Sequence, residues 1–144
     1  MKTSDNVWVC RHSWNQSLDQ WEGDGKNVLS SEEFISRPVC GKYTPMTFKD
    51  LLMLLSDYPD AFVMLDSKQY SVRNYQKTLE DYADYIELAQ EAGVPDVMGQ
   101  VIPEIYNQAM FAGTALLYNF PAYILFVMAG IFQRRSDRDC SILQ

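Results

Sequence analysis

The sequence predicts an α/β fold, and three observations support this prediction. Short apolar runs of strand length alternate along the chain with segments of helical periodicity. The run at 61–66 is continuously apolar up to its last residue, which is typical of a strand covered on both faces in a parallel sheet. Strands that alternate with helices form parallel sheets with right-handed crossovers. The 144 residues are enough for one domain with a single core.

The first expected strand lies at Val7–Cys10, where β-branched and aromatic residues precede the polar stretch Arg11-His12-Ser13. His12, the only histidine in the chain, would then lie at the carboxyl end of this strand. Residues 15–27 are polar and contain two glycines, so we expect a surface loop there.

Two helix starts are marked by capping residues. Ser30 or Ser31 can cap a short helix that ends before Pro38. Thr47 is a good N-cap for a helix at 48–57, because its side-chain oxygen accepts from an otherwise unpaired N–H. The acidic residue three positions later, Asp50, completes a variant of the capping box.

The second half of the chain continues the alternation. The clearest helix begins after Ser71 and ends at Gly93, since its apolar residues recur at spacings of three and four. The other expected elements are a strand at 61–66, a strand at 97–102, a helix at 107–117 and a strand at 123–128.

Ligands of parallel sheets gather at the carboxyl ends of the strands. On this assignment His12, Asp66 with Lys68, and Glu104 with Tyr106 all lie at one rim. An imidazole there can donate or accept a proton near neutral pH. A carboxylate and an ammonium group two residues apart suit a hard metal ion and a phosphate.

The net charge of −7 and the pI near 4.6 disfavour nucleic acid as a partner, because only the short group at 134–138 concentrates positive charge. Cys10, Cys40 and Cys140 are odd in number and widely spaced. We therefore expect free thiols rather than a disulfide framework or a metal site.

No secretory signal is visible at the start, so we expect a cytoplasmic protein. A membrane-associated alternative exists, because Ala109–Phe132 carries no charge and is long enough to span a bilayer, with Arg134 and Arg135 following it. Asn119 and Pro121 interrupt that stretch and divide it into a helix, a turn and a strand.

Four blocks in order, "VCRHSWNQSL", "GKYTPMTFKDLLMLL", "DAFVMLDSK" and "VIPEIYNQAMF", resemble the glycerophosphodiester phosphodiesterases, within the phosphatidylinositol-phospholipase-C-like TIM barrels. The resemblance spans about residues 7–128, and its specificity lies in the ordered agreement of all four blocks. It implies hydrolysis of glycerophosphodiesters or lipid head groups with two histidines and a divalent metal, calcium or magnesium.

The same resemblance assigns roles to individual residues. His12 matches the histidine that protonates the leaving alkoxide, and Asp66 matches a metal-binding carboxylate. Lys68 matches the basic residue that faces the phosphate, and Glu104 stands where many relatives have glutamine. The residues that we expect to contact the substrate are Arg11, Lys68, Glu104 and Tyr106.

The chain also departs from the family. The family's His-Arg strand end and the Glu-x-Asp pair that follows it do not occur before His12, and Ser13 replaces the usual aspartate. Losing one partner of an acid–base pair typically costs ~10² to 10⁴ in rate. We therefore expect weak or no hydrolysis by this chain alone, and a non-catalytic binding or regulatory module is the alternative.

About four strands are expected, whereas a complete barrel has eight. The predicted architecture is thus a partial (β/α) TIM-type barrel with about four parallel strands and flanking helices. Residues 1–133 would form this single incomplete domain, and 134–144 would form a polar tail. Exposed sheet edges in such a domain favour self-association.

Overall fold

The structure is a computed structural model that describes residues 1–18, 21–67 and 75–126. Within these residues it contains helices and a three-stranded parallel sheet in the order β1-β2-β3. The elements are α1 (Ser31–Ile35), α2 (Phe48–Asp57), β1 (Val63–Leu65), α3 (Gln76–Glu91), the 3₁₀ helix η1 (Pro95–Gln100), β2 (Val101–Ile105), α4 (Gln108–Leu117) and β3 (Ile124–Leu125).

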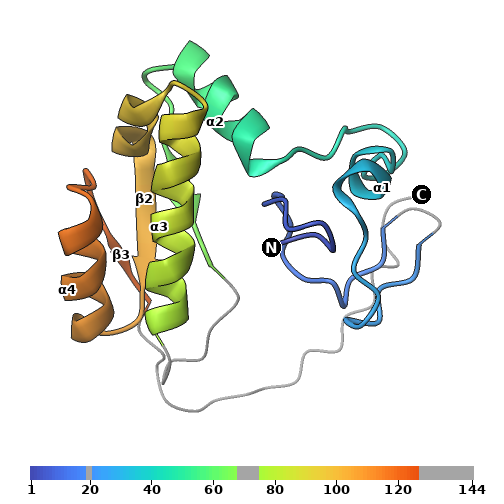
Figure 1. The fold of residues 1–144 in the computed structure, drawn as a ribbon, viewed down its shortest axis with the longest axis horizontal. Helices are drawn as coiled ribbons and strands as arrows, with labels where there is room; N and C mark the ends of the chain where they lie inside the picture. The colour runs from blue at the N-terminus through green and yellow to red at the C-terminus, as the bar shows by residue number, and fades with distance from the viewer. Residues whose placement is uncertain (19–20, 68–74, 127–144) are drawn as a thin grey trace, which may run out of the picture.

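All three strands of the sheet run parallel. Val63 pairs with Val101 and Glu104 pairs with Ile124, so the central strand β2 has a parallel neighbour on each side. Helices α3 and α4 connect successive strands and lie side by side on one face of the sheet (Figure 1). Consecutive parallel strands whose connecting helices lie on one face are typical of a chain that repeats a β/α unit.

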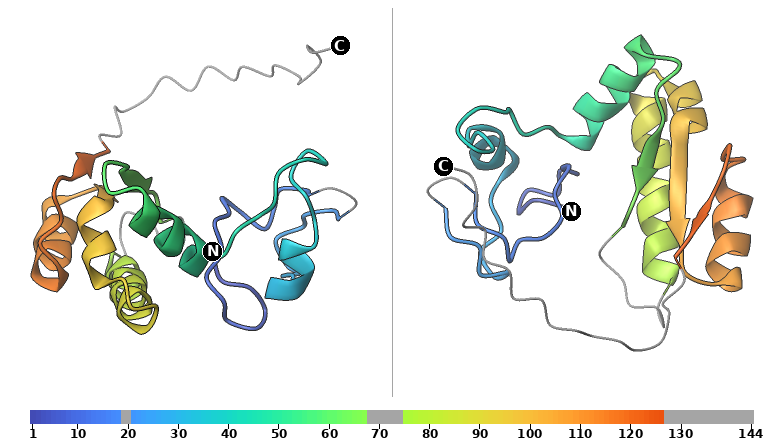
Figure 2. Two further views of the ribbon diagram at one scale, coloured as in Figure 1. Left: turned by 90° about the horizontal axis from the view of Figure 1, so that it is seen from above. Right: turned by 180° about the vertical axis from the view of Figure 1, so that it is seen from behind.

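Figure 2 shows that the described chain has two halves. The sheet with α2, α3 and α4 forms one half, and residues 1–46 with α1 form the other, beside β1. Two buried clusters follow this division, except that Trp8 from the first half belongs to the larger cluster. The larger one includes Leu52, Tyr82, Met98 and Val101, and the smaller one is built around Trp14 and Phe34.

The predicted caps of the first two helices are confirmed. The Ser30 and Thr47 hydroxyls accept from the backbone N–H groups of Glu33 and Asp50, whose carboxylates in turn accept from the N–H groups of the capping residues. Each cap therefore satisfies two donors that the helix itself leaves unpaired. The helix predicted at 107–117 is confirmed as α4, with Asn107 as its N-cap.

Close contact between α3 and α4 depends on a small residue. A Cβ built on Gly113 would lie 2.5 Å from Leu79 Cδ1, which is too short for a real contact. With any larger residue at position 113, the Leu79 side chain would have to shift. The predicted helix after Ser71 is confirmed from Gln76 onward, and its proposed cap lies outside the described residues.

The second face of the sheet is largely open among the described residues, contrary to the prediction for the strand at 61–66, although Glu104 on that face is buried. Along β1, Val63 and Leu65 pack against the core, but Met64 is 54% exposed. The register places Met64 and Ile102 on the same face, together with Ile124 of β3 and Phe126, which follows β3. The last two are also exposed. The apolar run at 61–66 therefore has one set of side chains packed against the core and another set on an open face.

Two predicted strands are wrong or displaced. Val7–Cys10 is not a strand of the sheet. Trp8 bridges Lys2 and Val9 bridges Thr47, both in antiparallel fashion. The physical reason is a tight turn at 3–7, where Asn6 has φ +63° and the N–H of Thr3 donates to Val7 O, so the segment folds back on residues 1–3.

The strand predicted at 97–102 begins only at Val101, because Pro95 starts a 3₁₀ helix that continues to Gln100. The side-chain amide of Gln100 then donates to the carbonyl oxygens of Leu55, Tyr58 and Ala61. These bonds fix the turn into β1 against the start of β2.

The apolar stretch proposed as a membrane span is divided, as Asn119 and Pro121 suggested. It forms α4 from its second residue onward and then β3. The remainder of the stretch beyond Phe126 lies outside the described residues, like the predicted tail at 134–144. Among the described residues, no helix combines the length and the apolar character needed to cross a bilayer.

Candidate functional site

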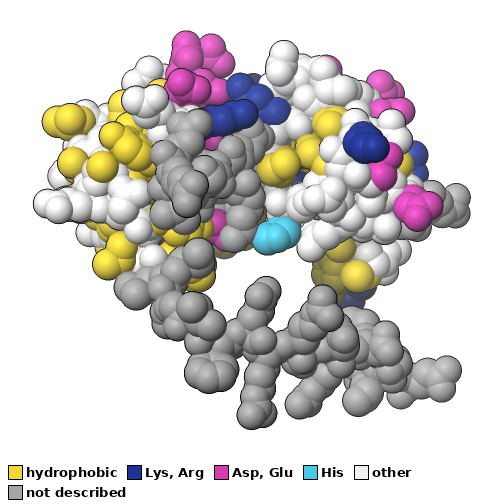
Figure 3. Space-filling model, turned by 90° about the horizontal axis from the view of Figure 1, so that it is seen from below, with side chains coloured by type: hydrophobic (Ala, Val, Ile, Leu, Met, Phe, Trp, Pro, Cys, Tyr) yellow, Lys and Arg dark blue, Asp and Glu magenta, His cyan; other side chains and the backbone are white. Residues whose placement is uncertain are grey.

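A cavity of about 300 Å³ opens where the two halves of the chain meet. Its walls come from the N-terminal segment, from α2 and α3, and from β1. Both His12 and Asp66 line it. Figure 3 looks onto the carboxyl ends of the strands, and the cyan side chain of His12 lies at the surface between the two halves. The structure therefore brings together two of the residues that the sequence assigned to one site.

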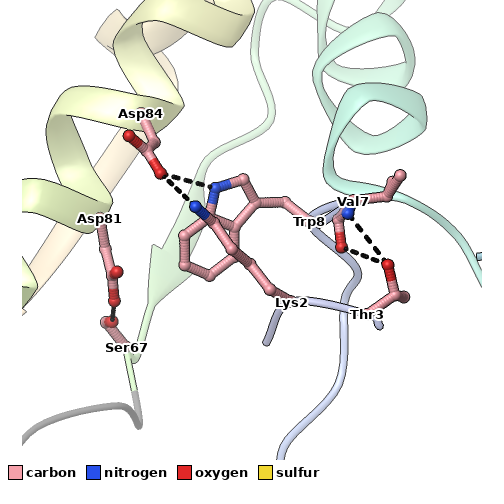
Figure 4. A network of polar contacts seen from close by, with 7 residues as sticks. All are labelled: Lys2, Thr3, Val7, Trp8, Ser67, Asp81 and Asp84. Atoms are coloured by element: carbon pink, nitrogen blue, oxygen red, sulfur yellow. Dashed lines mark hydrogen bonds and ion pairs between the residues drawn. The ribbon is translucent and has the colours of Figure 1, made fainter. Parts of the chain in front are cut away.

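The N-terminal segment is held against α3 by Trp8, which is 7% exposed. Its ring meets the Tyr85 ring edge to face, with 4.8 Å between centroids. Its indole N–H donates to Asp84 Oδ2 at 3.2 Å, and Lys2 Nζ forms an ion pair with the same oxygen at 2.7 Å (Figure 4). This contact positions the loop that carries His12.

Arg11 is half-buried and lies among aromatic rings rather than facing the strand ends. Its guanidinium carbon is 5.0 Å from the Trp14 ring centroid and 5.3 Å from that of Trp21. One guanidinium N–H also donates to the carbonyl oxygen of Gln16. Burial lowers the pKa of Arg11 from its usual value. Arg11 still contributes to the cavity wall, and the rings fix its position.

His12 is exposed and follows Arg11 on the same loop. Cys10 lies two residues earlier, and its N–H donates to Met46 O at 3.0 Å. The residue as a whole is exposed, but desolvation of the thiol raises the pKa of Cys10 to about 11, so the thiol is neutral at physiological pH. His12 reaches the rim from a loop and not, as predicted, from the end of a sheet strand.

The structure places three predicted site residues at or near the carboxyl ends of two neighbouring strands. Asp66 follows β1, Glu104 is the next-to-last residue of β2, and Tyr106 follows β2. The Tyr106 hydroxyl donates to Asp66 Oδ1 at 3.1 Å, which joins the carboxyl ends of the two strands. The side chain of Glu104 is buried, and it lies on the sheet face that also carries Met64 and Ile102. Three of the predicted site residues thus converge at one rim. Lys68, which was also predicted there, lies outside the described residues.

A second polar group lies beneath α3 and was not predicted from the sequence. The Ser67 hydroxyl donates to Asp81 Oδ2 at 2.7 Å, and both side chains are buried (Figure 4). Burial raises the pKa of Asp81 despite this hydrogen bond. Asp81 lies on the face of α3 that points into the core. This position on the helix is the only sequence signal that could have marked Asp81 as a buried carboxylate.

Tyr82 and Tyr85 complete this buried group. The Tyr82 hydroxyl donates to the carbonyl oxygen of Leu65 at 3.1 Å. Burial, reinforced by neighbouring acidic groups, raises the pKa of both phenols well above the usual range. Both tyrosines therefore remain protonated hydrogen-bond donors beside the strand ends and do not act as bases at neutral pH.

The site offers few ligands for the divalent metal that the resemblance implies. Calcium takes six to eight oxygen ligands, and magnesium needs near-ideal octahedral geometry. Asp66 is the one carboxylate among the cavity-lining residues. Within residues 1–18, 21–67 and 75–126, no three His, Cys, Asp or Glu side chains gather as a metal-binding group. The described residues do not fit calcium or magnesium, and we derive no chemical step through a metal.

Comparisons with known protein families, curated proteins and solved structures found no match to this chain.

Proposed function

We propose that the chain carries part of a phosphodiester-hydrolysing site of the glycerophosphodiester phosphodiesterase type, with His12 as general acid. The observation that supports this most directly is the shared cavity. His12 and Asp66 are 54 positions apart in the sequence, yet both line it. The barrel itself belongs to the same proposal. Its support is the sheet wound in sequence order with α3 and α4 on one face.

In the proposed reaction a water oxygen bonds to phosphorus while the bond between phosphorus and the leaving alkoxide breaks. The protonated imidazole of His12 gives its proton to that alkoxide, and the water proton passes to solvent. Arg11 contributes a fixed positive charge in the cavity wall beside His12. The hydrogen bond from Tyr106 holds Asp66 in place at the opposite side of the rim.

The proposed hydrolysis is weak, since no second histidine exists in the sequence to act as the base. The test is release of glycerol 3-phosphate from glycerophosphocholine in the presence of calcium or magnesium. We expect slow turnover that His12→Ala abolishes, with Lys42→Ala, an exposed cation outside the cavity, as the matched control. Turnover that survives His12→Ala contradicts the assignment of His12.

A non-catalytic binding module is the second candidate. Ser13 favours it, because this residue stands where the family's aspartate would orient the histidine. In that case the chain binds glycerophosphocholine without turnover and without a metal. Calorimetric titration, carried out beside the hydrolysis assay, separates the two candidates.

Self-association is part of the same proposal. The uncovered sheet face carries exposed apolar side chains, and β1 and β3 are the outer strands of the described sheet. Unpaired strand edges and open apolar faces promote association between copies. Sedimentation velocity is expected to show a concentration-dependent dimer, and a monomer at all concentrations contradicts this expectation.

A further inference from the structure

The surface formed by α4 and β3 is apolar and carries no charge. Residues 105–133 contain no Asp, Glu, Lys, Arg or His, whereas the whole chain has a net charge of −7. At this end of the molecule, on the left of Figure 3, hydrophobic side chains gather with no charged side chain among them. An uncharged surface on a strongly acidic protein indicates a place where another apolar surface binds.

The two sides of α4 lie in opposite environments. On the inner side, Met110 is buried in the main core. The outer side carries Phe111, Ala112, Ala115 and Leu116, which are all exposed and lie on one face of the helix by their spacing. Leu116 is 89% exposed. A helix at the surface of a globular protein normally has polar residues on its outer side, so α4 has the pattern of a helix that packs against a further element.

The strand β3 extends this surface beyond α4. The rings of Phe111 and Tyr123 meet edge to face with 4.9 Å between centroids, which joins α4 to the segment before β3. Leu125 of β3 is 57% exposed, and no described strand pairs with the outer edge of β3. Free strand edges readily pair with another chain. Together, the outer side of α4 and Leu125 are called the α4–β3 face below.

We propose that two copies of the chain associate through the α4–β3 face, related by a twofold axis. The inference rests on the self-association within the proposed function and names the surface responsible. Both copies are acidic, so they approach closely only where the surface has no charge. The face exposes roughly 500 Å² per copy, and about 1,000 Å² in total is the lower limit for a specific interface, so the expected dimer is weak.

The other open parts of the sheet suit a second copy less well. The second face of the sheet carries Glu104, and two copies that met there would bring two carboxylates into one interface. The outer side of β1 is flanked by the N-terminal half of the chain (Figure 2). The α4–β3 face has neither a charge nor a neighbouring half.

Sedimentation velocity over a concentration series tests the proposal with three matched variants. Leu116→Glu changes the α4–β3 face at an almost fully exposed side chain, so the fold tolerates it. Leu54→Glu makes the same change at an exposed position of α2, and Met64→Glu makes it on the second face of the sheet. We expect the dimer dissociation constant to rise at least about tenfold in Leu116→Glu and to stay within about twofold of the wild type in the other two.

The results separate this inference from the broader self-association. Equal increases in Leu116→Glu and Leu54→Glu overturn the inference, because they reflect net charge alone. A dimer that Met64→Glu disrupts and Leu116→Glu does not also overturns it, while self-association stands. Higher salt screens the repulsion between acidic copies and should strengthen the dimer. A dimer that weakens with salt depends on ion pairs and contradicts the proposal.

Cross-linking tests the twofold arrangement directly. Ala112 lies near the middle of the outer side of α4, so the proposed axis brings position 112 of both copies close together. In a chain with its three native cysteines replaced by serine, we expect a short bismaleimide to link Ala112→Cys into a dimer but not Leu54→Cys. No linked dimer for Ala112→Cys overturns the proposal.

Other occupants of the α4–β3 face give different results. A monomer at all concentrations that binds phosphatidylcholine vesicles, with binding lost in Leu116→Glu, shows that the face meets a bilayer and overturns the proposal. None of these measurements involves release of glycerol 3-phosphate. The hydrolase can therefore fail while the dimer stands, and the dimer can fail while the hydrolase stands.

Discussion

Replacement of Trp8 tests whether the N-terminal segment is docked on α3. In Trp8→Ala the buried indole is lost together with its contact to the Tyr85 ring at 4.8 Å. Truncation of a buried tryptophan typically costs about 3–5 kcal/mol of unfolding free energy. For a chain of this length, that corresponds to a fall in Tm of roughly 2–4 °C per kcal/mol.

Trp8→Phe separates packing from hydrogen bonding. It keeps a ring against Tyr85 but removes the indole N–H that donates to Asp84. Asp84 is 41% exposed, so water can replace the lost donor, and we expect a cost of only about 1 kcal/mol. Asp84→Asn removes the ion pair with Lys2 but keeps an acceptor, and it should cost no more than Trp8→Phe.

Urea unfolding followed by far-ultraviolet circular dichroism measures these differences without relying on tryptophan fluorescence. A second readout is hydrogen exchange at the Cys10 amide, which donates to Met46 O and should lose protection in Trp8→Ala. If Trp8→Ala unfolds within about 0.5 kcal/mol of the wild type, a size typical of surface substitutions, the docking is refuted.

Three further predictions concern single contacts. Thr47→Ala should cost about 1 kcal/mol in urea unfolding by removing the α2 cap, and Thr47→Ser should restore it; equal stabilities would contradict the cap. Asp5 accepts from Ser31 and Thr3, which lowers its pKa to about 2, so its stabilisation is present above the unfolded value of 3.8 and is lost as pH falls toward 2. A carboxyl titration by nuclear magnetic resonance with a midpoint near 4 would contradict this. Thr78 Oγ1 is buried and has no hydrogen-bond partner among the described residues, so Thr78→Val should raise the unfolding free energy by about 1 kcal/mol, and a loss of stability would show that the hydroxyl is satisfied.

The elements that were predicted well from the sequence depend on local chemistry. The caps at Ser30 and Thr47 use side chains within three residues of the N–H groups that they bind, so the sequence pattern contains the whole interaction. The parallel pairing of β1 with β2 follows from the helix between them. The order of residues also indicated that Asp66 and Tyr106 would lie at one rim, since each follows a strand, and the structure adds the hydrogen bond between them.

The errors come from interactions between distant parts of the chain. Val7–Cys10 has the composition of a strand, but the turn at Asn6 pairs it locally before it could reach the sheet. The apolar residues of β1 do not show whether another element covers the second face of the sheet. The sequence therefore could not predict that only one face of β1 is buried. Asp81 was missed because its partner, Ser67, lies 14 residues away, in the segment after β1.

The position of the His12 loop depends on the contact between Trp8 and α3, and one measurement tests it most directly. Nuclear Overhauser effects between the indole protons of Trp8 and the ring protons of Tyr85 report a separation that the structure places at 4.8 Å between centroids. We predict strong cross-peaks between these two rings. Their absence, with Trp8 contacts confined to residues 1–47, would contradict the shared cavity of His12 and Asp66.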